Sequence, residues 1–247
     1  MGDRRGEVSL PGRPWPSDYQ ADPARFAANE TATALFSRGG DVHLQVAQRL
    51  ARATTGPVLD LGDGTGHLSR LLTVRSVTTV RSVTTVVVDN APHLAQAPGL
   101  RVLADACRLP FPAATFTAAA ALWMLYHLDE PTAALRELHR VLQPGGLFAA
   151  CASSRTNDPE LADILPRWGQ ATSFDAEDAP DIIGEVFEVV DVVRWDAPLV
   201  RLPDRAAAMV FLRGRGLPEA DAHHRAARLP VPLDVTKRGV LVWARRR

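Results

Sequence analysis

Cysteine and lysine are scarce in this sequence of 247 residues, and neither sign of charge is in excess. Its two cysteines, Cys107 and Cys151, are too few for a disulfide framework or a cysteine-based zinc site. The 28 basic residues, among which Lys237 is the single lysine, balance 28 acidic ones. This balance argues against a general nucleic-acid binder, which needs a surplus of positive charge.

Long hydrophobic segments are missing as well. The longest apolar run, residues 118–126, is much shorter than the roughly 20 residues of a membrane-spanning helix. The first 14 residues are polar and lack the apolar core of a secretory signal. We therefore expect a cytoplasmic protein that binds neither nucleic acid nor membranes, with a monomer and a homodimer both open.

Strand-like and helix-like segments alternate in the middle of the chain. A helical pattern at 131–142 begins with a proline and ends at Pro144-Gly-Gly. The apolar runs that read as strands are 57–61, 86–89, 100–104, 118–123 and 147–152. This alternation predicts a parallel sheet covered by helices on both faces, with ligands at the carboxyl ends of the strands.

The flanking segments are less regular. Asp22 and Asp41 are expected to cap two helices that follow a proline-rich arm of 21 residues. The acidic stretch after residue 155 precedes a basic one, and between strand-like runs at 185–193 and 240–244 lies a helix-like segment at 204–213. Two interpretations stay open for the acidic stretch: it neutralises the neighbouring basic surface, or it covers a pocket that holds a cation.

A perfect tandem repeat separates the first two strands. The hexamer Val-Arg-Ser-Val-Thr-Thr occurs at 74–79 and again at 80–85. It is too short for a solenoid unit. Because six residues preserve the two faces of a strand but rotate a helix, we expect a longer connection or strand start.

Three alternating glycines follow the first predicted strand. Gly62, Gly64 and Gly66 permit positive φ angles and a close approach of a ligand to the backbone. His67 stands where a dinucleotide-binding motif needs its last glycine, and the lysine of a phosphate loop is missing. A glycine triplet alone can also be no more than a tight turn.

Acidic residues are expected on the same rim. Asp89 ends the second strand, where it can accept hydrogen bonds from both ribose hydroxyls of a nucleoside or cap the next helix. Asp105 follows the third strand and can bind an adenine amino group. Together with Asp60 and Asp63, and with no lysine or arginine placed for phosphates, they suit a cationic nucleoside without phosphates.

Residues 57–152 resemble the class I S-adenosylmethionine-dependent methyltransferases of the small-molecule type. The motifs that carry the resemblance are Leu-Asp-Leu-Gly-x-Gly-Thr-Gly at 59–66, Val-Val-Asp at 87–89, Asp-Ala-x-x-Leu-Pro-Phe at 105–111, Leu-Tyr-His-Leu at 125–128 and Arg-Val-Leu-Gln-Pro-Gly-Gly at 140–146. The resemblance implies an α/β fold with a Rossmann-like, doubly wound, mostly parallel seven-stranded sheet. It also implies an arm and helical cap in 1–56 and a cofactor-binding domain in 57–247, with the acidic insert around 156–184.

The family's cofactor is S-adenosylmethionine, which becomes S-adenosylhomocysteine when the methyl group leaves. By resemblance, the glycine turn holds the methionine part, Asp89 the ribose, and Asp105 and Ala106 the adenine. The full set of expected contacts is Asp60, Gly62, Asp63, Gly64, Gly66, Asp89, Asn90, Asp105, Ala106, Leu122 and, from the arm, Tyr19. Asp63 departs from the family, which has a small residue there.

The expected function is methyl transfer to a small-molecule acceptor in bacterial specialised metabolism, with oxygen first and nitrogen or carbon possible. His127 is the candidate general base, although it can instead pack around the cofactor. Trp123 and Tyr126 are the candidate acceptor contacts. No metal is expected, because His223 and His224 have no third ligand at a suitable spacing. The alternatives are another reaction on the same fold, such as a cyclisation, and a non-catalytic partner subunit.

Overall fold

The computed structural model describes residues 22–54, 56–73 and 83–247. Tyr19 and most of the tandem repeat lie outside these residues, so the expectations for them are not addressed by the structure. No helix in the described ranges combines the length and the apolar character that crossing a membrane requires.

Seven strands form one sheet in the order β3-β2-β1-β4-β5-β7-β6. In chain order the strands are β1 (Val58–Leu61), β2 (Thr85–Asp89), β3 (Leu100–Leu103), β4 (Phe116–Leu122), β5 (Leu142–Ser153), β6 (Glu188–Leu202) and β7 (Leu233–Arg245). The first five pair in parallel, and β7 runs antiparallel between β5 and β6. The predicted doubly wound, mostly parallel sheet is confirmed.

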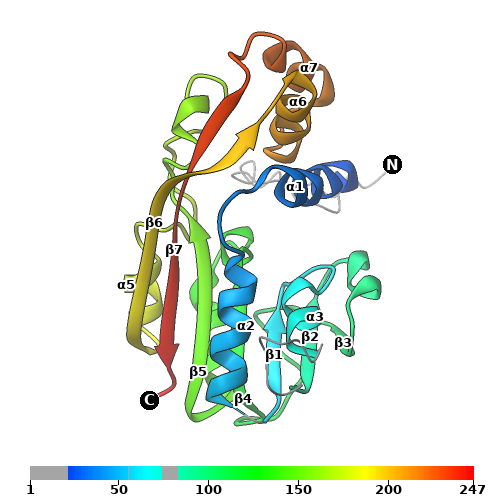
Figure 1. Cartoon of the computed structure of the whole chain (residues 1–247). Coiled ribbons are helices and arrows are strands. Elements are labelled where there is room, and N and C mark those ends of the chain that lie inside the picture. Colours follow the sequence, from blue (N-terminus) through cyan, green and yellow to red (C-terminus); the bar gives the residue numbers. More distant parts are fainter. Residues whose placement is uncertain (1–21, 55, 74–82) are drawn as a thin grey trace, which may run out of the picture.

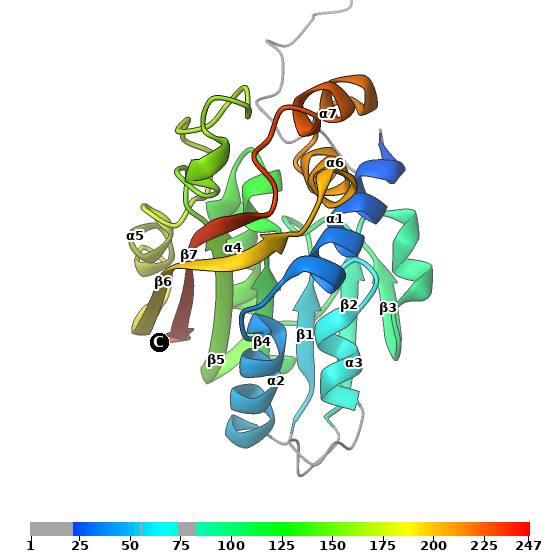
Figure 2. The same cartoon turned by 45° about the horizontal axis from the view of Figure 1, so that its top comes forward.

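Helices cover both faces of the sheet. One face carries α2 (Val42–Ala53) and α3 (His67–Thr73), and the other carries α4 (Pro131–Val141) and α5 (Ala179–Gly184). Three further helices, α1 (Pro23–Phe36), α6 (Arg205–Gly214) and α7 (Glu219–Ala226), lie above the carboxyl ends of the parallel strands (Figures 1 and 2). Short 3-10 turns occur at Pro92–Gln96, Leu125–His127 and Pro159–Leu161.

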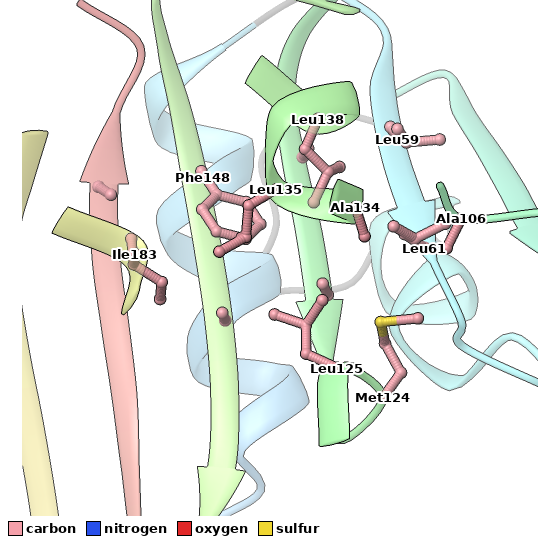
Figure 3. Close-up of a cluster of buried hydrophobic side chains, with 14 of the residues drawn as sticks. Leu59, Leu61, Ala106, Met124, Leu125, Ala134, Leu135, Leu138, Phe148 and Ile183 are labelled. Atoms are coloured by element: carbon pink, nitrogen blue, oxygen red, sulfur yellow. The ribbon is translucent and has the colours of Figure 1, made fainter. Parts of the chain in front are cut away.

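The two helical layers form because successive strand residues point to opposite faces. In β4, Ala118 and Ala120 pack with α2 and α3, whereas Ala119 and Ala121 pack with α4. Figure 3 shows the second layer, in which side chains of α4 lie against Phe148 of β5. The small alanines let both helical layers approach this central strand closely.

Polar side chains begin the first two helices, as predicted. The Asp22 carboxylate accepts a hydrogen bond from the Arg25 amide at 3.2 Å, and a proline occupies the first turn. The Asp41 carboxylate accepts one from the His43 amide at 2.9 Å. Residues 42–53, which the expected boundary at 56/57 assigns to the N-terminal cap, bury Val46 and Leu50 in the same core as the strands.

The C-terminal third departs most from the sequence prediction. Strands β6 and β7 extend well beyond the predicted runs at 185–193 and 240–244, because they pair with each other from Glu188 to Leu202. Helices α5 and α7 were not predicted. Helix α5 has only six residues, too few for a helical pattern, and α7 buries only the small side chains of Ala222 and Ala226.

Several carboxylates of the acidic insert are paired with basic neighbours. Arg155 pairs with Asp175 at 2.8 Å and with Asp178 at 2.6 Å. The buried Asp158 carboxylate pairs with Lys237 of β7 and, at 3.0 Å, with Arg215 beyond α6. These ion pairs favour the first of the two interpretations, mutual neutralisation, over an acidic cover for a bound cation.

Candidate active site

A cavity of about 1600 Å³ lies at the carboxyl ends of the parallel strands, between the sheet and α1 and α6. Its lower lining comes from the loops after β1, β2, β3 and β4, and its upper lining from α1, α6 and the insert. This is the edge where ligands bind in open parallel sheets. The insert contributes only Ala171, Thr172 and Ser173, none of them acidic.

The turn after β1 needs glycine for two reasons, its backbone conformation and its close packing against neighbouring residues. Gly62 and Gly66 have φ angles of 73° and 86°, which other residues rarely adopt. A Cβ atom on Gly62 would lie 2.7 Å from the Met124 side chain, and one on Gly66 would lie 2.5 Å from Pro98. Gly62 and Gly64 line the cavity, whereas Gly66 does not.

Asp89 is the last residue of β2. Its carboxylate accepts hydrogen bonds from the Gly64 amide at 3.0 Å and from the Ala91 amide at 2.9 Å. It therefore connects the glycine turn to the loop after β2 and also caps that loop, so both expected roles are compatible. Asp89 and Asn90 line the cavity.

The loop after β3 is held from below by α4. Asp105 and Ala106 line the cavity, and the Asp105 carboxylate accepts a hydrogen bond from the Cys107 amide at 2.8 Å. Glu137 accepts one from the Leu109 amide at 2.8 Å, and the same carboxylate pairs with Arg140 at 2.7 Å. The hydrogen bond from Arg140 lowers the pKa of Glu137.

Two of the predicted acidic residues, Asp63 and Asp60, differ in whether they line the cavity. Asp63 lines the cavity, and its carboxylate accepts a hydrogen bond from the Ser69 amide at 3.2 Å, in the first turn of α3. Asp60 is 1% exposed and lies outside the cavity lining, where Ser69 Oγ donates to it at 2.7 Å. Burial, and then the nearby Asp63, raise the pKa of Asp60. Asp60 therefore occupies a supporting position behind the turn, and its contact with the cofactor stays a prediction.

His127 lies in the turn after β4, together with the candidate acceptor contacts. Leu122, Trp123, Tyr126 and His127 all line the cavity. The Tyr126 and His127 rings are 4.6 Å apart, and Trp123 meets Trp195 of β6 edge to face at 5.9 Å. Ser173 of the insert donates a hydrogen bond to the Leu128 carbonyl at 2.6 Å, which holds the end of this turn from above.

Several lining residues were missed by the sequence prediction. Glu30 of α1 accepts a hydrogen bond from Thr65 Oγ1 at 2.9 Å and so links the cap to the glycine turn. Arg215 and Lys237 also line the cavity, away from the acidic strand ends, where no basic residue was expected for phosphates. Burial and the neighbouring Arg215 lower the pKa of Lys237 to about 8, against the opposing effect of Asp158.

The sequence offered one signal for these residues. Lys237 stands out as the single lysine of the chain. Nothing in the sequence connects Glu30 with Thr65, or Arg215 with Lys237, because these residues lie on elements that only the tertiary fold brings together.

Comparison with known proteins points to one family. The family model of a methyltransferase domain matches residues 59–150. A demethylmenaquinone methyltransferase of Mycolicibacterium paratuberculosis is 29% identical over 193 residues, which are 74% of this chain and 77% of that protein. An O-methyltransferase of Aspergillus nomiae is 31% identical over 138 residues, 53% of this chain and 59% of its own length.

The fold has close counterparts among solved structures. The cyclase SpnF superimposes with a TM-score of 0.60 at 18% identity, covering 92% of this chain and 94% of that one. The chain spans about half the length of three curated relatives, which it matches over 41%, 59% and 55% of their own length. The motifs, the sheet order and the matched domain are those of the class I S-adenosylmethionine-dependent methyltransferases, a family whose cofactor is S-adenosylmethionine.

Proposed function

We propose that this protein transfers a methyl group from S-adenosylmethionine to a small-molecule acceptor, with oxygen as the first choice and nitrogen or carbon as alternatives. The observation that carries the proposal is a cavity that joins the carboxylates at the ends of β1–β3 to His127 and the aromatic side chains beyond β4. Bacterial specialised metabolism is the setting that we propose for the reaction.

The residues at the strand ends fit the cofactor by their chemistry. Between Leu61 and Cys107, the described lining carries the carboxylates of Asp63, Asp89 and Asp105 and no lysine or arginine. Carboxylates accept hydrogen bonds from ribose hydroxyls and amino groups, and they attract sulfonium and ammonium charges. We assign to the cofactor the cavity-lining residues Gly62, Asp63, Gly64, Asp89, Asn90, Asp105, Ala106 and Leu122.

Catalysis then depends on how this chain holds the acceptor. The cofactor supplies an electrophilic methyl group, and a collinear nucleophile at near-contact distance accounts for most of the rate. We propose that His127 accepts the proton of the acceptor, because it lines the cavity just past the end of β4. Trp123 and Tyr126 would hold the acceptor in place and keep water away from it.

The acceptor side of the cavity has its own chemistry. Phe211 of α6 lies beneath the Arg215 guanidinium at 4.7 Å and the Lys237 ammonium at 5.6 Å, and all three residues line the cavity. The Asp158 carboxylate that pairs with both cations is outside the lining. This arrangement supports an aromatic acceptor that carries an acidic group.

A cyclisation on the same fold is the second candidate function. It is supported by the similarity to the cyclase SpnF, which covers 92% of this chain. Such a reaction would use the aromatic part of the cavity without a methyl acceptor. A third possibility, a non-catalytic partner subunit, predicts no cofactor binding at all.

The proposal is tested by incubating the protein with S-adenosylmethionine that carries a ¹³C-labelled methyl group and a panel of phenolic acids, their methyl esters and aromatic amines. Mass spectrometry should detect a labelled methyl product, with phenolic acids preferred over esters. Cofactor binding without labelled product from any acceptor would favour the cyclisation, and no binding would favour the partner subunit. The Asp89→Ala variant serves as the control for enzyme-dependent transfer.

We also propose a different division of the chain from the one expected. α1 packs with α6, and both share a core with α7, so these three helices form the cap, whereas α2 belongs to the sheet domain.

Both cysteines are free thiols, which supports the cytoplasm as the proposed compartment.

A further inference from the structure

Two histidines and an aspartate from the starts of α2 and α3 meet on the wall of the cavity. Asp41 precedes α2, His43 lies in the first turn of α2, and His67 begins α3. The ligand atoms of the three side chains all lie within 4.8 Å of one another. All three residues line the cavity, on the side of the glycine turn.

The fold itself brings these side chains together. α2 and α3 pack side by side on one face of the sheet through Leu50, Leu68 and Leu72. Their amino-terminal ends therefore lie next to each other at the rim. The Asp41 carboxylate also caps α2, which fixes its position between the two imidazole rings.

The donor atoms are spaced like metal ligands. His43 Nδ1 lies 3.1 Å from Asp41 Oδ1, and His67 Nε2 lies 2.9 Å from Asp41 Oδ2. Ligands that each lie about 2.0–2.1 Å from a zinc ion are about 2.9–3.4 Å from their neighbours in octahedral or tetrahedral geometry. Each nitrogen–oxygen pair therefore already has the separation of two adjacent ligands.

We propose that Asp41, His43 and His67 form a binding site for a divalent transition-metal ion of the zinc, cobalt or iron class. Two imidazoles and one carboxylate are the donor set that these ions share. The side chains of His43, Asp41 and His67 are 22%, 39% and 51% exposed, so an ion can reach them from solvent. The positions left open face the cavity and can bind water or an oxygen of a cavity ligand.

The competing explanation is a hydrogen-bonded clasp between α2 and α3 that needs no metal. In that case, the histidines serve only to hold the Asp41 carboxylate, and added metal binds weakly and without regard to these residues. The two explanations differ in metal affinity, so a direct titration separates them. This site does not depend on the proposed methyl transfer.

The test uses the full chain without a histidine tag, after treatment with EDTA and removal of the chelator. Zn²⁺ is titrated by calorimetry, and Co²⁺ by the visible absorption of a four- or five-coordinate complex. The variants are His43→Ala, His67→Ala and Asp41→Asn, since asparagine keeps the helix cap. His224→Ala, which removes an exposed histidine of α7, is the matched control.

We expect one Zn²⁺ per chain, with affinity at least about tenfold lower in each of the three site variants and unchanged in His224→Ala. Circular dichroism verifies that each variant is folded. His43→Ala and His67→Ala each remove one proposed imidazole ligand, so they test the site independently. Absence of binding at 100 µM Zn²⁺, or equal affinity in wild type and both histidine variants, would overturn the proposal.

Discussion

The Asp89 carboxylate is hydrogen bonded to two backbone amides, those of Gly64 and Ala91, as well as facing the cavity. Replacing it with alanine removes a charged acceptor from both. We expect Asp89→Ala to weaken the binding of S-adenosylhomocysteine by about 1.5–3 kcal/mol. Ligand-induced thermal shifts measure this change. The exposed Asp196 of β6 provides the control, because Asp196→Ala should bind normally, and unchanged affinity in Asp89→Ala would refute the ribose assignment.

Two measurements on one variant of His127 distinguish a general base from a residue that only packs around the cofactor. If it is the general base, His127→Ala should lower turnover by about 10²–10⁴-fold and leave cofactor affinity nearly unchanged. The wild-type rate should rise with pH through the imidazole pKa, and the variant should lose this rise. Parallel loss of affinity and rate, with the rise retained, would assign His127 to cofactor packing. His224→Ala controls for the loss of an exposed imidazole.

The two cysteines provide an internal probe of the cavity. Cys107 lines it, whereas Cys151 is fully buried in β5. Burial raises the pKa of both thiols, and Asp105 raises that of Cys107 further. We expect iodoacetamide to modify Cys107 slowly at pH 8 and Cys151 only after unfolding.

Saturating S-adenosylhomocysteine should slow the modification of Cys107 several-fold, since the ligand would cover the loop after β3. Peptide mass spectrometry reports both sites in one sample, and Cys151 is the control for global unfolding. Equal rates with and without the ligand would place the cofactor away from this loop.

Glu137 and Arg140 of α4 form a clamp that determines where the loop after β3 lies. Arg140 donates to the Phe111 carbonyl at 2.7 Å and to the Leu109 carbonyl at 3.0 Å, while Glu137 accepts from the Leu109 amide. Glu137→Gln keeps the shape of this clamp but removes its negative charge. We expect a loss of stability of about 0.5–1.5 kcal/mol, measured by urea unfolding at pH 7.

The same clamp predicts a pH dependence. The pKa of Glu137 is lowered in the folded protein from its ordinary value of 4.5, so the unfolded chain takes up the proton more readily. The clamp therefore stabilises the fold fully above pH 4.5 and loses this contribution as the pH falls through the lowered pKa. The stability difference between wild type and Glu137→Gln should shrink below pH 4.5, and a constant difference would contradict the clamp.

The elements that could be predicted are those whose boundaries are local. Strands β1 and β2 end in a glycine turn and in Asp89, and α4 starts at Pro131, so the sequence marks each boundary directly. The lengths of β6 and β7 could not be predicted, because each is set by pairing with the other strand. Helix α7 was not predicted, because its buried face consists of alanines.

The cavity as a whole depends on contacts between distant parts of the chain. Asp22 before α1 pairs with Arg213 of α6 at 2.6 Å, and Glu30 reaches Thr65 of the glycine turn. The position of the strand-end carboxylates on the cavity could be predicted, because these residues follow successive strands. The acceptor side, with Arg215 and Lys237, could not, because no sequence spacing connects these residues.

We propose that this cavity binds the methyl donor at the carboxyl ends of the strands. Calorimetric titration of the full chain with S-adenosylhomocysteine tests it most directly, because it needs no acceptor. We predict saturable binding with one ligand per chain, and loss of the signal when the protein is already saturated with S-adenosylmethionine. Absence of binding heat up to about 1 mM ligand, at which even a millimolar dissociation constant would be detected, would contradict the account.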